Sequence, residues 1–311
     1  RHLAAILIYQ QGKTWQYIVA GICVGLTASS KYNGGLIILL VLMAHLLRYG
    51  KAALKQPNLY LAVLFCGIGF FATTPYAILD STKFLADLKF EAQHYASGHA
   101  GMDGNSLVWY LNYMWETGTG LYPLAVAGIV YGAIRHPKET VLLSIFPVAY
   151  FAFISNFIVR NDRTFLPLAA FLFVLAAWFL IELPDKFRTL QPESLRKPAL
   201  AILAGLALVA LAQPISKTIA DARSLETVNS RETARVWIDN NLPPGAKVAI
   251  ESYAPFVDPS RFAVQGFVRM IENAPEWYSE QGFDYLVFSQ GIYGRFYREP
   301  ERYHNEKSQY D

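Results

Sequence analysis

The chain is poor in cysteine and in the short motifs that mark nucleotide and metal sites. Only two of its 311 residues are cysteines, Cys23 and Cys66, and each lies inside an apolar run. Two isolated cysteines indicate neither a disulfide framework nor a metal site. The polar region 218–311 contains no GxGxxG, no P-loop and no metal-ligand spacing. The sequence also lacks internal repeats and low-complexity stretches, which excludes a repeat architecture.

Charged residues are scarce as well. They make up 16% of the chain against 53% hydrophobic residues, and the mean hydropathy is +0.24. An ordinary soluble domain has about 25% charged residues. Residues 1–217 hold 17 basic and 10 acidic side chains, whereas residues 218–311 hold 10 and 14. This division predicts a basic membrane part followed by a mildly acidic soluble part, and it gives no reason to expect a nucleic-acid partner.

Basic residues occur in every second gap between the hydrophobic segments. Short cytoplasmic loops of membrane proteins retain Lys and Arg, so the alternation predicts a polytopic membrane protein and assigns each loop to one side. The intervening gaps at 31–34, 80–117 and 155–163, and everything after residue 217, are then expected outside the cytoplasm. The basic gaps hold Lys13; Arg48, Lys51 and Lys55; Arg135 and Lys138; and Lys186, Arg188, Arg196 and Lys197.

Seven apolar segments approach the roughly 20 residues that cross a bilayer as a helix. They cover about 15–30, 32–48, 58–79, 118–135, 139–158, 163–183 and 197–216. The first two are short and are separated by the glycine-containing bend at 29–35. Residues 3–10 resemble the tail of an earlier helix, and no signal peptide is evident. We therefore expect this chain to be part of a longer protein, with at least one membrane segment before residue 1.

The external gap 80–117 begins with a helical pattern. Apolar side chains recur on one side and polar side chains on the other, which predicts an amphipathic helix along the membrane interface. A glycine-rich stretch and an aromatic segment, WYLNYMW, follow. The apolar side is expected to hold Phe84, Leu85, Leu88, Ala92 and Tyr95, and the polar side Lys83, Asp87, Glu91 and His94.

Residues 218–311 have the pattern of a small α/β domain with partly parallel strand pairing. A helix is expected at 229–242, with Asn229 and Glu232 as a capping-box pair. The apolar runs AKVAIES and DYLVFSQ are strand candidates, and a short helix is expected from Pro275 to Gly282. The predicted fold class is therefore an α-helical polytopic membrane protein over residues 1–217 with a small extracytoplasmic α/β domain over 218–311.

Ionisable side chains at the external boundary are the candidate functional residues, because charges bordering a membrane segment are costly. Lys31, Arg160 and Arg163 would together suit a phosphate group. Glu91 and His94 belong to the external loop. Structural alternatives stay open for each of them: the arginines could reach lipid phosphates, Lys31 could cap the preceding helix, and His94 could make hydrogen bonds within the loop.

Four stretches resemble GT-C glycosyltransferases of the family that includes protein O-mannosyltransferases and bacterial aminoarabinose transferases. GLTASSKYNGGLIILLVLMAHLL is similar to a helix pair of that family, and TTPYAILD followed by FEAQHYASGHAG is similar to an external loop of its bacterial members. VRNDRTFLPLAAFLFVLAA and ARVWIDNNLPPGAKVAIES are similar to a later membrane helix and to the C-terminal domain. The resemblance covers nearly the whole chain.

The resemblance implies an enzyme that moves a sugar, with inversion, from a polyprenyl-phosphate carrier to a glycan, lipid or protein acceptor. Lys31, Arg160 and Arg163 would contact the carrier phosphate, and Glu91 and His94 the acceptor or the sugar. Asp80 would orient the loop or assist a divalent metal, whose requirement stays open. The general base is expected upstream of residue 1, so this chain alone is expected to be inactive.

The expected location is the plasma (inner) membrane, with many spans and the C-terminal domain outside the cytoplasm. Two other functions stay open. One is a non-catalytic scaffold for assembly of a cell-envelope polymer. The other is a lipid or solute transporter, which would be expected to contain paired interrupted helices.

Overall fold

The computed structural model describes residues 2–102, 104–188, 194 and 196–311. The chain forms two compact units, one of Arg1–Gly98 with Gly104–Lys217 and the other of His99–Asp103 with Thr218–Asp311. Part of the fourth predicted basic gap, including the side chains of Lys186, Arg188 and Arg196, lies outside the described residues.

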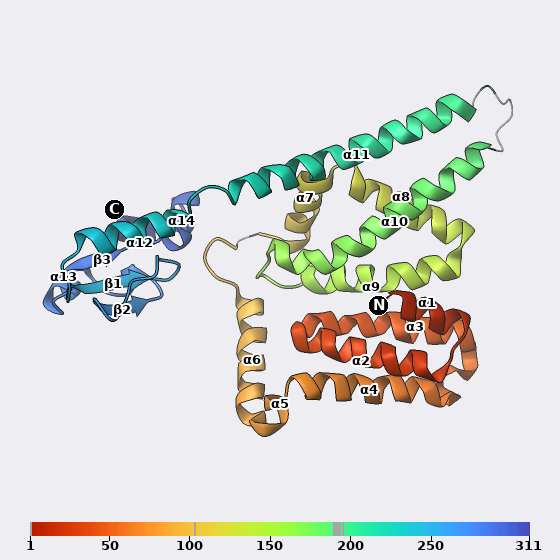
Figure 1. Ribbon diagram of the computed structural model, residues 1–311, viewed down its shortest axis with the longest axis horizontal. Coiled ribbons are helices and arrows are strands. Elements are labelled where there is room, and N and C mark those ends of the chain that lie inside the picture. Colours follow the sequence, from red (N-terminus) through yellow and green to blue (C-terminus); the bar gives the residue numbers. More distant parts are fainter. Residues whose placement is uncertain (1, 103, 189–193, 195) are drawn as a thin grey trace. The chain divides into compact units, whose positions relative to one another are not determined.

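The first unit is built from helices (Figure 1). The 3-10 helices η1 (Tyr32–Ile37) and η2 (Gly50–Lys55) flank α3, and α11 continues past Lys217. The α-helices are α1 (His2–Gln10), α2 (Thr14–Ser30), α3 (Ile38–Tyr49), α4 (Pro57–Thr73), α5 (Tyr76–Leu79), α6 (Ser81–Ser97), α7 (Ser106–Gly118), α8 (Leu121–Arg135), α9 (Pro137–Ser155), α10 (Asp162–Arg188) and α11 (Arg196–Ser224).

Four to five helical segments of the described chain are long and apolar enough to cross a membrane. Four qualify alone: Tyr32–Lys55, Pro137–Ser155, Asp162–Leu183 and Lys197–Ser224. The fifth is the pair α7 and α8, which are bent by 109° at a short break. The predicted segment 15–30 corresponds to α2, which has 17 residues, whereas α4 also has 17 residues and is shorter than the predicted segment 58–79. The predicted segment 58–79 is interrupted after Thr73, since the residue before Pro75 is disfavoured in a helix.

The backbones of α2 and α4 approach each other closely. A Cβ atom on Gly21 would lie 2.3 Å from the carbonyl oxygen of Ala62, and one on Gly25 would lie 2.2 Å from that of Cys66. Gly21 and Gly25 are four residues apart and therefore lie on one face of α2. Small residues at this spacing let membrane helices pack backbone to backbone, where apolar burial contributes little.

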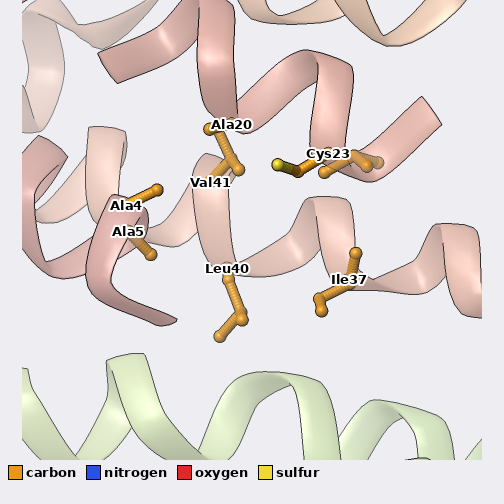
Figure 2. Close-up of a pocket in the computed structure, with 8 residues that line it drawn as sticks. Ala4, Ala5, Ala20, Cys23, Ile37, Leu40 and Val41 are labelled. Carbon is orange, nitrogen blue, oxygen red and sulfur yellow. The ribbon is translucent and has the colours of Figure 1, made fainter. Parts of the chain in front are cut away.

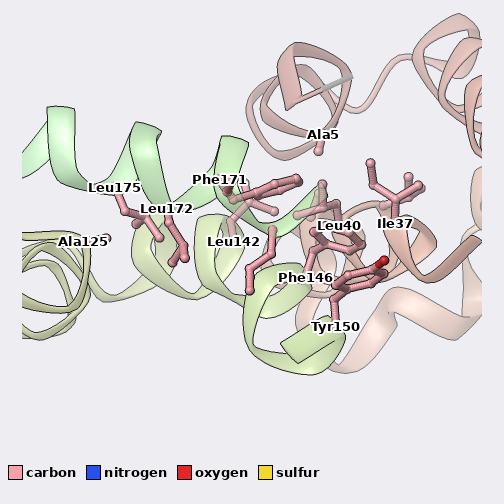
Figure 3. Close-up of a cluster of buried hydrophobic side chains, with 14 of the residues drawn as sticks. Ala5, Ile37, Leu40, Ala125, Leu142, Phe146, Tyr150, Phe171, Leu172 and Leu175 are labelled. Carbon is pink, nitrogen blue, oxygen red and sulfur yellow. The ribbon is translucent and has the colours of Figure 1, made fainter. Parts of the chain in front are cut away.

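A cluster of buried apolar side chains joins α1 and α3 to α8, α9 and α10 (Figure 3). Leu40 of α3 lies near Phe146 of α9, and Phe146 packs on Phe171 of α10 with ring centroids 4.6 Å apart. The buried Tyr150 hydroxyl donates a 2.9 Å hydrogen bond to the carbonyl oxygen of Thr164. These contacts fix α9 and α10 against the N-terminal helices.

The first three basic gaps meet at one end of this unit, here called the basic end. A Cβ atom on Gly12 would lie 2.3 Å from Arg48 Nε, so the loop before α2 lies on the end of α3. The Tyr9 hydroxyl lies 3.5 Å from Oε1 of Glu139, so the start of α9 lies at the same end. The basic end comprises Lys13, Arg48, Lys51, Lys55, Arg135 and Lys138.

The intervening gaps meet at the opposite end of α3, here called the Lys31 end. It comprises residues 31–34, α6 and residues 156–163. The predicted interfacial helix is confirmed as a helix, and α6 runs across the ends of α2 and α4 (Figure 1). Phe84 contacts Tyr32 near the start of α6, with centroids 6.1 Å apart. Near its end, the Tyr95 carbonyl accepts hydrogen bonds from the amides of Ile158 and Val159.

The second unit contains a three-stranded parallel sheet with the order β2-β1-β3. Along β1, Val248 faces Ile238 and Leu242 of α12, while Ala249 faces Met270 and Tyr278. The predicted strands at β1 and β3 are confirmed, whereas β2 was not predicted. The elements are α12 (Ser230–Asn241), β1 (Lys247–Glu251), β2 (Ala263–Phe267), η4 (Met270–Glu272), α13 (Pro275–Glu280), β3 (Tyr285–Val287), α14 (Gln290–Arg298) and α15 (His304–Tyr310).

The predicted capping box at the start of α12 is wrong in one half. Asn229 is the N-cap and accepts a 2.9 Å hydrogen bond from the amide of Arg231. Glu232 instead pairs with Arg235 one turn later, with Oε2 2.9 Å from Nε. The guanidinium competes with the backbone amide for the carboxylate, and the charged donor forms the stronger bond.

Candidate functional site

A pocket of about 520 Å³ opens at the Lys31 end. Its floor and walls come from four segments far apart in the sequence: the end of α2 with η1, α6, the end of α9 and the start of α10. The walls are largely apolar, with a few polar groups at the α2–η1 junction and on α6. The lining residues are Ser29, Ser30, Lys31, Tyr32, Asn33, Leu88, Glu91, Ala92, Tyr95, Phe153, Ile154, Phe157, Val159 and Thr164.

Lys31 is the positively charged residue of the pocket lining. Loss of surrounding water, and then the positive charge of Arg163, lower the pKa of Lys31 below its usual range. Within the part of the chain that the structure describes, neither Lys31 nor Arg163 forms an ion pair with a carboxylate. Two neighbouring cations that are engaged in no ion pair favour the binding of an anion between them.

Glu91 lines the pocket together with Leu88 and Tyr95 of α6. The sequence predicted it on the polar side of the helix, and the residue is exposed. It still shares the lining with two apolar residues, because positions three and four apart are neighbours on a helix surface. Leu85, predicted on the apolar side of an interfacial helix, is 61% exposed. Glu91 and Lys31 therefore line one pocket, although they are not within ion-pair distance.

Asn33 is a pocket residue that the sequence did not single out. Its side-chain oxygen is buried and has no hydrogen-bond partner among the described residues. A buried acceptor without a donor costs free energy, so a ligand hydroxyl or a water that reaches it is favoured. Its place directly after Lys31 and Tyr32, at the break between α2 and α3, was the only signal in the sequence.

The end of α6 is fixed to the segment before α10. Gly98 ends the helix at a φ of +72°, and a Cβ atom there would lie 2.3 Å from Cγ2 of Ile158. The amide of Ile158 in turn donates a 3.1 Å hydrogen bond to the Tyr95 carbonyl. Glycine is required here for both backbone conformation and close approach. This contact positions the α6 wall of the pocket.

Arg160 is not among the residues that line the pocket. It is 8% exposed, and Nη1 donates to the Gly104 carbonyl at 3.2 Å and to the Ser106 hydroxyl at 3.3 Å. Ser106 in turn donates to the carbonyl of Phe157. Arg160 therefore ties the start of α7 to the segment before α10. Its contact with a carrier phosphate stays a prediction.

Asp80 and His94 also lie outside the pocket lining. Asp80 is the N-cap of α6 and accepts a 3.1 Å hydrogen bond from the amide of Lys83. The His94 ring stacks on Phe90 with centroids 6.4 Å apart. Among the described residues, no cluster of His, Cys, Asp or Glu side chains could hold a metal ion. Asp80 thus orients α6, and its predicted assistance to a metal has no partner ligands in the described chain.

A second cavity, between α1, α2 and α3, is too small and too apolar to be a substrate site (Figure 2). Its volume is about 20 Å³, and Cys23 lines it together with alanine, valine, leucine and isoleucine side chains. A water molecule needs several polar partners as well as space. This cavity is therefore a packing gap in the helical unit.

Comparison with known proteins finds no matching family model, no matching curated protein and no matching solved structure.

Proposed function

We propose that the protein is a membrane glycosyltransferase that moves a sugar from a polyprenyl-phosphate carrier to an acceptor outside the cytoplasm. The observation that supports this most is the place of Lys31 in an apolar-walled pocket at the end of membrane-type helices, with the positive charge of Arg163 near enough to lower the pKa of Lys31. A polyprenyl phosphate carries an anionic group at the end of an apolar chain. The pocket offers both environments, and ligand sites commonly measure about 300–1,000 Å³.

The chemistry assigns different tasks to the two signs of charge. The acceptor hydroxyl attacks the anomeric carbon, the bond from that carbon to the phosphate oxygen breaks, and the carrier leaves as a phosphate. Lys31 and Arg163 would stabilise the negative charge that develops on the leaving oxygen. Glu91, in the part of the lining that α6 provides, would hold hydroxyl groups of the sugar or the acceptor, since an ionised carboxylate accepts hydrogen bonds. The general base stays unassigned.

Transfer by the full-length protein in liposomes tests the proposal. The donor is a radiolabelled polyprenyl-phosphate sugar, and the readout is label released to water or acceptor. Lys31→Ala and Arg163→Ala are expected to weaken donor binding about ten- to a hundredfold, because a hydrogen bond to a charged group contributes about 1.5–3 kcal/mol. Lys89→Ala is the matched control, because Lys89 is an exposed cation of α6 outside the pocket. Equal losses in all three variants, or no turnover with any carrier sugar, would refute the proposal.

A lipid transporter is a second candidate, favoured by the 109° bend between α7 and α8. Transporters commonly carry two such breaks in corresponding positions, and the described part of this chain contains one broken candidate span. Movement of a labelled polyprenyl phosphate between leaflets without release of its sugar would favour this alternative.

A further inference from the structure

The basic end contains a polar pocket of about 560 Å³. Its walls come from the end of α1, the end of α3 and the first turn of α9. The lining residues are Tyr9, Gln10, Leu47, Arg48, Tyr49 and Lys138. The pocket lies at the opposite end of α3 from Lys31, and the 12 residues of α3 alone span about 18 Å. It is therefore separate from the proposed carrier site.

The guanidinium of Arg48 is held in place from three directions. Nη1 donates a 3.0 Å hydrogen bond to the Tyr9 carbonyl, and the guanidinium carbon lies 5.4 Å from the centroid of the Tyr49 ring. Gly12 lies against the side chain, where a Cβ atom would come within 2.3 Å of Nε. Fixing an arginine in this way reduces the entropy lost when its remaining N–H groups bind a ligand.

The charges of the pocket are not balanced internally. Neither Arg48 nor Lys138 has a carboxylate partner among the residues that the structure describes. Glu139, next to Lys138 in the sequence, accepts a 3.5 Å hydrogen bond from the Tyr9 hydroxyl through its carboxylate. Four further cations lie at the same end: Lys13, Lys51, Lys55 and Arg135. The pocket thus contains two positively charged side chains, Arg48 and Lys138, within a wider basic surface.

We propose that this pocket binds the headgroup of an anionic phospholipid. A phosphodiester can accept hydrogen bonds from Arg48 and Lys138 together, and the tyrosines Tyr9 and Tyr49 suit the headgroup region of a bilayer. Apolar side chains border the pocket: Leu47 lines it, and Leu46 of the same helix is 46% exposed. The acyl chain of a lipid can pack along this apolar surface, whereas a soluble phosphate has no apolar group to do so. A lipid is therefore favoured over a free phosphate.

Native mass spectrometry of the full-length protein in detergent tests the proposal, with phosphatidylglycerol or phosphatidylcholine as the probe. Wild type is expected to retain one phosphatidylglycerol, with an affinity for it at least about tenfold above that for phosphatidylcholine. Arg48→Gln and Lys138→Gln are expected to lose this preference. Lys51→Gln and Lys55→Gln are the matched controls, because they remove the same charge from the same end outside the pocket.

Three results would overturn the proposal. Equal loss in all four variants would indicate diffuse attraction to the basic surface. Equal retention of both lipids would remove the requirement for an anion. Displacement of the lipid by millimolar inorganic phosphate would assign the pocket to a soluble anion. Arg48→Gln also removes the bond to Tyr9, so Lys138→Gln gives an independent result if the first variant does not fold.

Discussion

The two ends of the helical unit use positive charge differently. At the basic end, six cations lie on loops and helix ends, and the polar pocket there contains arginine, lysine and tyrosine. At the Lys31 end, the pocket lining has a single cation, Lys31, which shares an apolar-walled pocket with a carboxylate and an amide oxygen that has no partner among the described residues. Cations on a polar surface favour a membrane of anionic lipids. A cation within apolar walls and beside hydrogen-bonding groups favours one specific anionic ligand.

The largest effect is expected from a substitution that disrupts the packing of α2 against α4, on which both ends of the helical unit depend. Gly25→Val places side-chain atoms where the backbones of α2 and α4 nearly touch, with the Cys66 carbonyl only 2.2 Å from the new Cβ. The two helices must separate, so we expect loss of folded protein and of ligand binding at both ends. Gly67→Ala in α4 is the control, because nothing lies within 4 Å of its new Cβ. Detergent-solubilised yield and thermal unfolding measure the effect, and wild-type stability of Gly25→Val would contradict it.

A pair of glycine substitutions separates the two ends. Gly98 and Gly50 both have positive φ, at +72° and +53°, but only a Cβ atom on Gly98 meets a neighbour, Ile158. Gly98→Ala should displace α6 and weaken ligand binding in the Lys31 pocket, in addition to a strain of about 1–3 kcal/mol. Gly50→Ala should carry the strain alone. Titration with polyprenyl phosphate and thermal unfolding distinguish the two variants. Equal binding by Gly98→Ala and Gly50→Ala would show that α6 does not shape the pocket.

Arg160 and Arg163 are three residues apart but should respond differently to substitution. Arg160→Met leaves the Gly104 carbonyl and the Ser106 hydroxyl without this donor, so the free energy of unfolding should fall by about 1–3 kcal/mol. Arg163→Met should leave stability unchanged and weaken binding of the carrier phosphate. Chemical unfolding and ligand titration measure the two quantities. Loss of binding in Arg160→Met together with loss of stability in Arg163→Met would indicate that the phosphate binds at Arg160.

The sequence predicted those features that depend on local pattern. The helix α6, the strands β1 and β3 and the apolar segments all have a periodicity visible over a few residues. Lys31 was also recognised, because a lysine between two apolar helices is unusual by itself. These features needed no knowledge of what lies opposite them.

Features that depend on a partner segment were missed. The close approach of Gly21 and Gly25 depends on their packing against α4, and the place of Glu91 in the pocket lining depends on the two contacts at the ends of α6. Arg160 and Arg163 could not be separated from the sequence, because the bond acceptors of Arg160 lie more than 50 residues earlier in the chain. The strand β2, AVQGF, has weak alternation and is specified mainly by its pairing with β1.

The smallest expected effect is a shift with pH at the Lys31 end. Lys31 is charged below its folded pKa, and that pKa is lowered, so phosphate binding should weaken at a lower pH than for an ordinary lysine. Lys31→Arg keeps its charge and should bind without this decline up to the pH at which an ordinary lysine titrates. Parallel titrations measure both, and identical profiles for wild type and Lys31→Arg would contradict the role of Lys31.

The most direct test of the account is whether the two ends lie on opposite sides of the membrane. With Cys23 and Cys66 replaced by alanine, one cysteine is introduced at Lys83 of α6 or at Lys51 of η2, both of which are exposed. A membrane-impermeant maleimide is then applied to intact cells and to permeabilised cells. We predict that Lys83→Cys is labelled in intact cells and that Lys51→Cys is labelled only after permeabilisation. Labelling of both from the same side would contradict the assignment of a carrier pocket and a lipid-binding basic end to opposite faces.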